Sequence, residues 1–335
     1  MRSAETRQAG WAGTESEVMD MRQAVVTVFG GTGFIGRHVV RRLAERGATV
    51  RVPTRRPRNA GFLQPMGNVA QIVLVPFDGT DEARIAALLD GATHAVNLVG
   101  ILAERRAGDF VALQGELPGR IAQAATAAGV RRMVQISAIG ADPASPSLYA
   151  RTKAQGEAAA RAGFASATIL RPSVVFGPED GFFNRFAAMA RLSPALPLIG
   201  GGRTRFQPVY VADVAEAVMA GLTAPDTAGN TYELGGPRSY SMRELLTYML
   251  AVIERRRLLV NLPWGVANTI GRFAELLPDP PLTRDQVELL KRDNVVSQDA
   301  AGLAELGIVP TPLEVVVPTY LRQYAAQSPR LPVSL

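Results

Sequence analysis

The sequence contains no cysteine, and its only histidines are His38 and His94. Without cysteine the chain can form no disulfide, no thiolate nucleophile and no cysteine metal site, and two histidines argue against a histidine-built metal centre. No uninterrupted apolar run reaches the roughly 18–20 residues that a bilayer-crossing helix needs. We therefore expect no bound metal, and a chain that is soluble or peripheral to a membrane.

Acidic residues are in the minority: the formal net charge is +6, and nearly all of the positive charge is arginine. A basic surface suits nucleic acid, anionic lipid or an acidic protein partner, although arginine richness also follows from genome base composition. No segment matches a nucleic-acid recognition module, so we expect no nucleic-acid partner.

The first twenty residues lack the apolar core of a secretory signal and are too acidic for a mitochondrial transit peptide. Because they are polar and aperiodic, we expect residues 1–21 to form a disordered tail. From Ala24 onward, short β-branched runs alternate with longer helical stretches, which is typical of a parallel sheet covered on both faces.

The expected strands are Val25–Phe29, Thr49–Pro53, Ile72–Pro76, Ala95–Val99, Met133–Ser137 and Thr168–Leu170. The expected helices are Gly36–Glu45, Asp81–Leu89, Leu113–Ala128 and Tyr149–Ala162. This order predicts an α/β fold, a Rossmann doubly wound parallel sheet with its ligand crevice at the carboxyl ends of the strands. We assign residues 22–238 to that nucleotide-binding domain and 239–335 to a small C-terminal α/β lobe for substrate or partner contact, interleaved with 171–238.

The strongest motif follows the first expected strand and reads Gly30-Gly31-Thr32-Gly33-Phe34-Ile35-Gly36. A strand before it and a helix after it are the context that a dinucleotide fingerprint requires. Gly30 permits the tight turn, Gly33 lets the backbone approach a pyrophosphate, and Gly36 allows close helix packing. The alternative is a merely tight βα turn. We expect the cofactor to contact Gly30, Thr32, Gly33, Phe34, Ile35 and Gly36.

The end of the second expected strand favours NADP(H) over NAD(H). A site for NAD places an acid there to hold the ribose 2′-hydroxyl, but this sequence has Arg55 and Arg56. Guanidinium groups pair with a 2′-phosphate; solvated loop arginines are the alternative. Further strand ends add expected cofactor contacts at Asp78, Asn97, Val99 and Gly100.

Tyr149 and Lys153 lie four residues apart and share one face of an expected helix. In that arrangement the ammonium group lowers the pKa of the phenol and holds the nicotinamide ribose, so the tyrosine becomes a usable general acid. The pair follows the fifth expected strand, which ends at Ser137.

The glycine loop, Asn97, the Tyr149/Lys153 pair and the segment 170–177 (LRPSVVFG) resemble the extended and atypical short-chain dehydrogenase/reductase superfamily over roughly Val25 to Gly236. The resemblance implies catalytic roles for Ser137, Tyr149 and Lys153, and further cofactor contacts at Ser137, Tyr149, Lys153, Pro172 and Val174.

A narrower resemblance rests on residues 137–141 (SAIGA), 200–215 (GGGRTRFQPVYVADVA), 232–237 (YELGGP) and 282–287 (LTRDQV). These segments are similar to the nucleotide-binding accessory subunits of respiratory complex I (NADH:ubiquinone oxidoreductase). The resemblance implies a tightly held structural NADPH, with other complex I subunits as partners where the peripheral and membrane arms meet, near the quinone site.

One departure bears on activity. Active extended members keep a hydroxyl residue beside the substrate carbonyl, at a position that corresponds here to Ile139. A missing hydrogen-bond donor lowers the rate by a factor of ~10²–10³. We therefore expect nucleotide binding without efficient turnover. The alternatives are a free NADPH-dependent reductase or epimerase that uses Tyr149 and Lys153, and a cytosolic nucleotide-sensing regulator.

The stretch 264–277 is amphipathic at helical spacing, with Trp264, Ile270, Phe273 and Leu277 on one face. It follows a basic cluster, so residues 254–277 suit contact with a membrane surface or partner helices; ordinary packing onto the core is the alternative. The arginine bias and the absent transit peptide favour a bacterial protein on the cytoplasmic face of the inner membrane, or else in the cytoplasm.

Three other polar residues suggest structural roles. His38 is expected to pack or lie at the surface, His94 to lie in a loop before a strand, and Asp213 to cap a helix rather than act as an acid.

Overall fold

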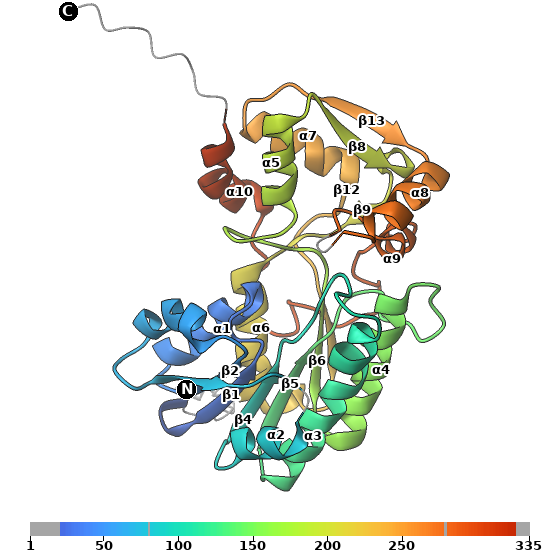
Figure 1. Cartoon of the computed structure of the whole chain (residues 1–335). Helices are drawn as coiled ribbons and strands as arrows, with labels where there is room; N and C mark the ends of the chain where they lie inside the picture. The colour runs from blue at the N-terminus through green and yellow to red at the C-terminus, as the bar shows by residue number, and fades with distance from the viewer. Residues whose placement is uncertain (1–20, 80, 278–279, 326–335) are drawn as a thin grey trace, which may run out of the picture.

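The computed structural model describes residues 21–79, 81–277 and 280–325, and the tail expected at the N-terminus lies outside this part of the chain except for Met21. Met21 is 3% exposed and packs into the core. The chain forms a larger lobe, which holds the main sheet, and a smaller lobe above it in Figure 1.

The larger lobe is built on a seven-stranded sheet in the order β11-β6-β5-β4-β1-β2-β3, and every pair in it is parallel. This confirms the doubly wound sheet. All six expected strands form, with shifts of one or two residues at their ends. The strands are β1 (Val25–Phe29), β2 (Thr49–Thr54), β3 (Ile72–Pro76), β4 (His94–Asn97), β5 (Arg132–Ile136), β6 (Thr168–Pro172) and β11 (Thr231–Leu234).

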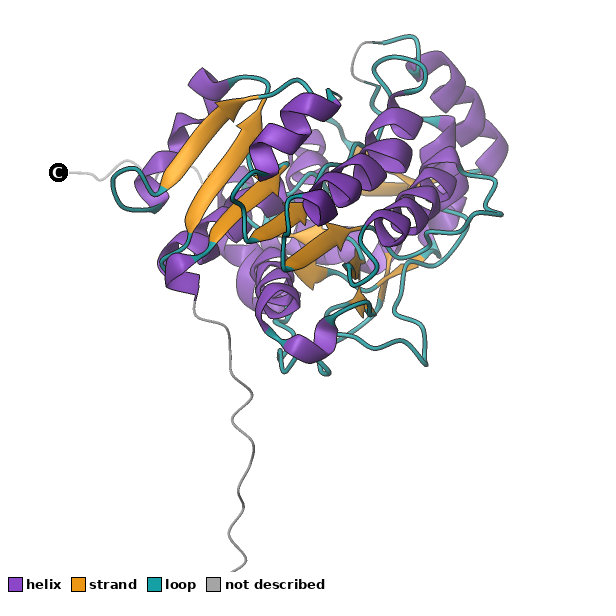
Figure 2. Ribbon diagram, turned by 90° about the horizontal axis from the view of Figure 1, so that it is seen from below, coloured by secondary structure: helices purple, strands orange, loops and turns teal. Residues whose placement is uncertain are grey.

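Helices cover both faces of this sheet, as Figure 2 shows from below. One face carries α1 (Phe34–Glu45) and α6 (Val211–Thr223), which pack against each other. The other carries α2 (Glu82–Leu89), α3 (Leu117–Ala127) and α4 (Leu148–Gly163). A π-helical segment, η3 (Val111–Glu116), opens the stretch expected as one helix. Short 3₁₀ segments are η1 (Met21–Gln23), η2 (Pro57–Met66) and η5 (Pro225–Thr227).

The smaller lobe has its own apolar core around Phe183, Leu246 and Val317. Its elements, with the short strands that join it to the larger lobe, are β7 (Val175–Phe176), α5 (Phe183–Leu192), β8 (Ala195–Ile199), η4 (Gly200–Gly202), β9 (Arg205–Phe206), β10 (Val209–Tyr210), β12 (Tyr240–Ser241), α7 (Met242–Val252), β13 (Leu258–Leu262), α8 (Trp264–Ala274), α9 (Arg284–Leu289), α10 (Leu313–Leu321) and η6 (Arg322–Tyr324). Between α9 and α10 the chain returns to the larger lobe, where Leu303 is buried in the core of the α1 face. The lobes are thus interleaved in sequence.

A candidate dinucleotide site at the carboxyl edge of the sheet

The glycine loop occupies the turn between β1 and α1. Gly30 has φ of +78°, and a Cβ built on it lies 2.9 Å from the carbonyl carbon of Leu98, at the end of β4. A Cβ on Gly36 lies 2.2 Å from the carbonyl oxygen of Gly30. Glycine is therefore required at both positions by the close approach of backbone. Among the residues that the structure describes, no side chain caps α1, which begins at Phe34, so the N–H groups of its first turn can bind a phosphate.

The loop lies at the point in the strand order where successive strands begin to be added on the opposite side of β1. β1 pairs with both β2 and β4, so the turns after β1 and β4 meet at one edge. This is the switch point at which doubly wound sheets bind ligands. The expected contacts Thr32, Phe34 and Ile35 are partly exposed here, and Gly33 is exposed.

Arg55 and Arg56 follow the carboxyl end of β2, and both are exposed. Neither forms an ion pair with any residue that the structure describes, so both guanidinium groups are available to an anion. The side chain of Asp78 follows β3, is 79% exposed and lies 4.0 Å from Arg84.

Asn97 is fully buried and uses its side chain inside the protein. Its amide nitrogen donates to Oε1 of Gln135 at 2.8 Å, and its oxygen accepts from the backbone nitrogen of Val99 at 3.1 Å. The side chain therefore fixes the turn that leads from Val99 to Gly100, rather than reaching out of it.

Lys153 comes to the same turn from α4. It is 6% exposed, and its Nζ lies 3.2 Å from the position of a Cβ on Gly100 and 5.8 Å from the ring centroid of Tyr149. Burial lowers the pKa of Lys153 to about 8. Burial and, second, the Asp285 carboxylate raise the pKa of Tyr149 to about 12. The expected lowering of the phenol pKa is therefore wrong in this state, because burial disfavours the charged phenolate, and Tyr149 is protonated at neutral pH.

Two buried polar atoms at this edge have no partner within the described part of the chain: Nε2 of Gln114 and Oγ of Ser137. Gln114 belongs to the π-helical segment, and its Oε1 lies 3.6 Å from the position of a Cβ on Gly100. Buried polar groups are nearly always paired, and π-turns gather at functional sites. These atoms therefore fit a polar ligand such as a ribose or an amide. The sequence pattern did not reveal Gln114, because a glutamine inside a helical stretch carries no distinctive signal.

The ends of β5 and β6 lie side by side next to Ser137. The backbone nitrogen of Ser137 donates to Leu170, and that of Ile139 donates to Pro172 at 3.1 Å. Ile139 is 9% exposed. The carbonyl oxygen of Val174 accepts from the backbone nitrogen of Val209, which continues the pairing toward the small lobe. The assignment of cofactor contacts to Pro172 and Val174 remains a prediction.

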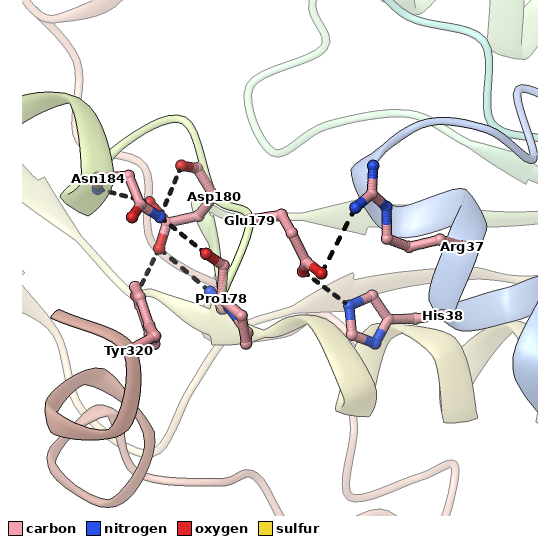
Figure 3. A network of polar contacts seen from close by, with 8 residues as sticks. Arg37, His38, Pro178, Glu179, Asp180, Asn184 and Tyr320 are labelled. Carbon is pink, nitrogen blue, oxygen red and sulfur yellow. Dashed lines mark hydrogen bonds and ion pairs between the residues drawn. The ribbon is translucent and has the colours of Figure 1, made fainter. Parts of the chain in front are cut away.

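A polar network joins α1 to the small lobe through the loop after β7 (Figure 3). Glu179 contacts Arg37 at 3.4 Å and His38 at 3.5 Å. Asp180, which is 3% exposed, accepts hydrogen bonds from backbone N–H groups and from the hydroxyl of Tyr320 on α10. Burial raises the pKa of Asp180 above its usual range. The network holds this loop beside the first helix of the dinucleotide fold.

Asp213 does not cap its own helix. Its carboxylate accepts from the backbone nitrogen of Thr311 at 2.7 Å and from the Thr311 hydroxyl at 2.9 Å. The residue thus has a structural role, as expected, but it fastens the segment that returns to the small lobe. Only the folded chain brings these two residues together.

A model of the NAD dependent epimerase/dehydratase family matches residues 26–235. The chain therefore belongs to that family. Within it, the chain is 37% identical over 303 residues to the mitochondrial NADH dehydrogenase [ubiquinone] 1 alpha subcomplex subunit 9 of Mus musculus, covering 90% of this chain and 80% of that subunit. The Arabidopsis thaliana subunit of the same name is 36% identical over 317 residues, covering 91% and 79%.

Two further comparisons show how widely the fold is shared. The ceramide reductase of Caulobacter vibrioides is 32% identical over 255 residues, covering 76% of this chain and 78% of that enzyme. The structure of DesIV, a dTDP-glucose 4,6-dehydratase from Streptomyces venezuelae with NAD and TYD bound, superposes with a TM-score of 0.70 at 22% identity, covering 90% and 96%. The structural likeness shows the fold alone.

Proposed function

We propose that this chain is an NADP(H)-binding accessory subunit of respiratory complex I without efficient turnover of its own. The observation that carries the proposal is the 37% identity to the mouse subunit, which spans 80% of that subunit's length. Similarity over nearly the whole chain includes both the dinucleotide lobe and the small lobe. A shared nucleotide fold alone would not require this, since one fold serves many functions.

The residues at the sheet edge fit an NADP(H) molecule. The loop Gly30–Gly36 and the start of α1 would hold the pyrophosphate, Arg55 and Arg56 the 2′-phosphate, and Lys153 the nicotinamide ribose. The bound nucleotide supplies hydride chemistry. The protein side of that chemistry is weak, because Ile139 places an apolar side chain where active relatives have a hydroxyl.

We further propose that the chain contacts other complex I subunits where the peripheral and membrane arms meet, on the cytoplasmic face of a bacterial inner membrane. Its contact with the membrane surface lies in residues 254–277. In the described part of the chain, every helix is too short or too polar to cross a bilayer. Of the side of this segment expected to be apolar, Trp264 packs against Gly200, whereas Ile270, Phe273 and Leu277 are 44%, 66% and 54% exposed, which supports contact with a membrane surface.

The test is mass spectrometry of native complex I purified from the source organism, with the released nucleotide identified in the same sample. We expect this chain in stoichiometric amount together with NADPH. A complex that lacks the chain, with the chain recovered in the soluble fraction, would refute the subunit role.

A free NADPH-dependent reductase or epimerase is the second candidate, favoured by the retained Tyr149 and Lys153 and by the similarity to a ceramide reductase. It predicts substrate-dependent NADPH oxidation by the purified chain. The variant Tyr149→Phe should abolish that oxidation.

A further inference from the structure

The small lobe contains an open pocket of about 430 Å³ that takes no part in the dinucleotide site. It lies where η4, α7 and β13 meet. The residues that line it are Gly201, Gly202, Arg203, Ser241, Arg243 and Asn261.

The pocket is positively charged. In the part of the chain that the structure describes, neither Arg203 nor Arg243 forms an ion pair, and the Arg243 guanidinium makes one long hydrogen bond there, of 3.5 Å, to the carbonyl oxygen of Gly201. The nearby acid, Glu244, is hydrogen-bonded to the pocket residue Ser241, since its carboxylate accepts from the backbone nitrogen and hydroxyl of Ser241 at 2.6 and 2.8 Å, and it pairs with neither arginine of the pocket. Two guanidinium groups and the amide of Asn261 are therefore free to bind an anion, and guanidinium geometry suits phosphate.

An exposed apolar surface begins beside this pocket. The indole of Trp264 lies against Gly200, where a Cβ would fall 2.1 Å from the ring, and this contact joins the start of α8 to the pocket loop. Along α8, Val266, Ile270 and Phe273 are 47%, 44% and 66% exposed. They recur at helical spacing on one side, whereas Ala267, Gly271 and Ala274 on the other side are buried.

Strand β13, which supplies Asn261 to the pocket, also carries exposed apolar side chains. Leu258 and Val260 are 70% and 50% exposed. Exposed apolar side chains beside unpaired arginines are the pattern of segments that lie in a bilayer interface, where the apolar groups enter the acyl boundary and the cations meet anionic headgroups.

We propose that the Arg203/Arg243 pocket binds the phosphate of an anionic phospholipid headgroup while α8 lies with its exposed apolar side in the same leaflet. The inference rests on the proposed membrane contact of residues 254–277 and names its ligand. A free phosphate would account for the pocket but not for the row of exposed apolar side chains beside it. A lipid accounts for both, because its phosphate and its acyl chains are covalently joined.

The experiment is flotation of the full chain, loaded with NADP(H), on phosphatidylcholine vesicles with and without phosphatidylglycerol. We expect binding to the anionic vesicles, reduced about 30-fold by the double variant Arg203→Gln/Arg243→Gln, since each basic side chain near the surface contributes about fivefold. The matched control is Arg106→Gln/Arg131→Gln, which removes the same charge from exposed positions on the larger lobe and should change binding little. Phe273→Ser should weaken binding to both kinds of vesicle.

Thermal unfolding of each variant checks that it folds, and inorganic phosphate serves as the soluble probe. Equal losses of vesicle binding in the pocket and control variants would overturn the headgroup site. Binding of inorganic phosphate by a chain that does not bind vesicles would also overturn it. Incorporation into complex I is scored separately. If the chain co-purifies with complex I but the pocket variant still binds vesicles, only the lipid site is refuted. If the chain binds vesicles but is absent from the complex, only the subunit role is refuted.

Discussion

The Oδ1 atom of Asp285 lies 2.6 Å from the backbone nitrogen of Leu148, so a carboxylate of the small lobe caps a helix of the larger one. The other oxygen accepts from the hydroxyl of Ser147 at 2.8 Å and from the backbone nitrogen of Tyr149 at 3.3 Å. Because α4 carries Tyr149 and Lys153, this contact fixes the small lobe directly beside the candidate site.

Replacement of Asp285 by alanine should lower the free energy of unfolding by about 1–3 kcal/mol, because it leaves partly buried N–H groups at a helix start without an acceptor. Urea unfolding measures this loss. The control is Asp299→Ala, at an exposed position, where a change within ~0.5 kcal/mol is expected. Equal effects of the two changes would show that the cap contributes nothing.

The glycine loop makes a second prediction. Gly36→Ala should abolish nucleotide binding and destabilise the fold, because the new Cβ would lie 2.2 Å from the carbonyl oxygen of Gly30 and force the loop open. Gly181→Ala is the control, since a Cβ there meets nothing within 4 Å. Nucleotide titration by fluorescence distinguishes the two, and normal binding by Gly36→Ala would refute the assigned loop.

Arg55 and Arg56 are predicted to discriminate NADPH from NADH. Their joint replacement by alanine should raise the Kd for NADPH about 10- to 100-fold, which corresponds to losing one or two charge-assisted hydrogen bonds. The Kd for NADH should hardly change, because that nucleotide lacks the 2′-phosphate. Calorimetric titration measures both Kd values, and the titration with NADH serves as the control. An equal loss of affinity for NADPH and NADH would show that these arginines do not contact the 2′-phosphate.

Because His94 is buried, we expect the free energy of unfolding to fall at acid pH. It is 1% exposed in β4, and burial, then Arg131 and Arg132, lower its pKa from 6.5 to about 4. The folded state favours the neutral ring, so this stability is present above the unfolded pKa and is lost as the pH falls from 6.5 toward 4, by roughly 2–3 kcal/mol. The variant His94→Gln should show a shallower loss in urea midpoints measured across this window.

We expect a strong energetic coupling between Arg171 and Glu157. The guanidinium makes two hydrogen bonds to Glu157, at 2.8 and 2.6 Å, and lies 3.6 Å from Glu233. Arg171→Met should destabilise the fold by about 3–5 kcal/mol, because it leaves buried carboxylates unpaired. Adding Glu157→Gln should recover part of that loss. A double-mutant cycle measures the coupling, and purely additive effects would contradict it.

Several features follow from local sequence. Alternating β-branched and helical stretches were sufficient for the order of strands and helices, because hydrophobic periodicity is a local property. The glycine loop was likewise readable, since Gly30 and Gly36 are demanded by a turn between neighbouring elements. The identity of the family rests on these same segments.

Other features needed the folded chain. His94 was expected in a loop, but it is buried in β4 between β1 and β5, because sheet position depends on partners far away in the sequence. Asp213 meets Thr311 across 98 residues, Asp285 meets Leu148 across 137, and Gln114 reaches the site through a π-helical turn.

The sequence by itself determined which segments form strands, where the glycine loop lies between the first strand and helix, and which arginines follow a strand end. Each of these depends on residues within a few positions of one another. Only the tertiary structure decided the pKa of Tyr149, the cap from Asp285 and the outward direction of the apolar side of α8. Desolvation and long-range hydrogen bonds arise when distant segments pack together, and no local pattern records which segments those will be.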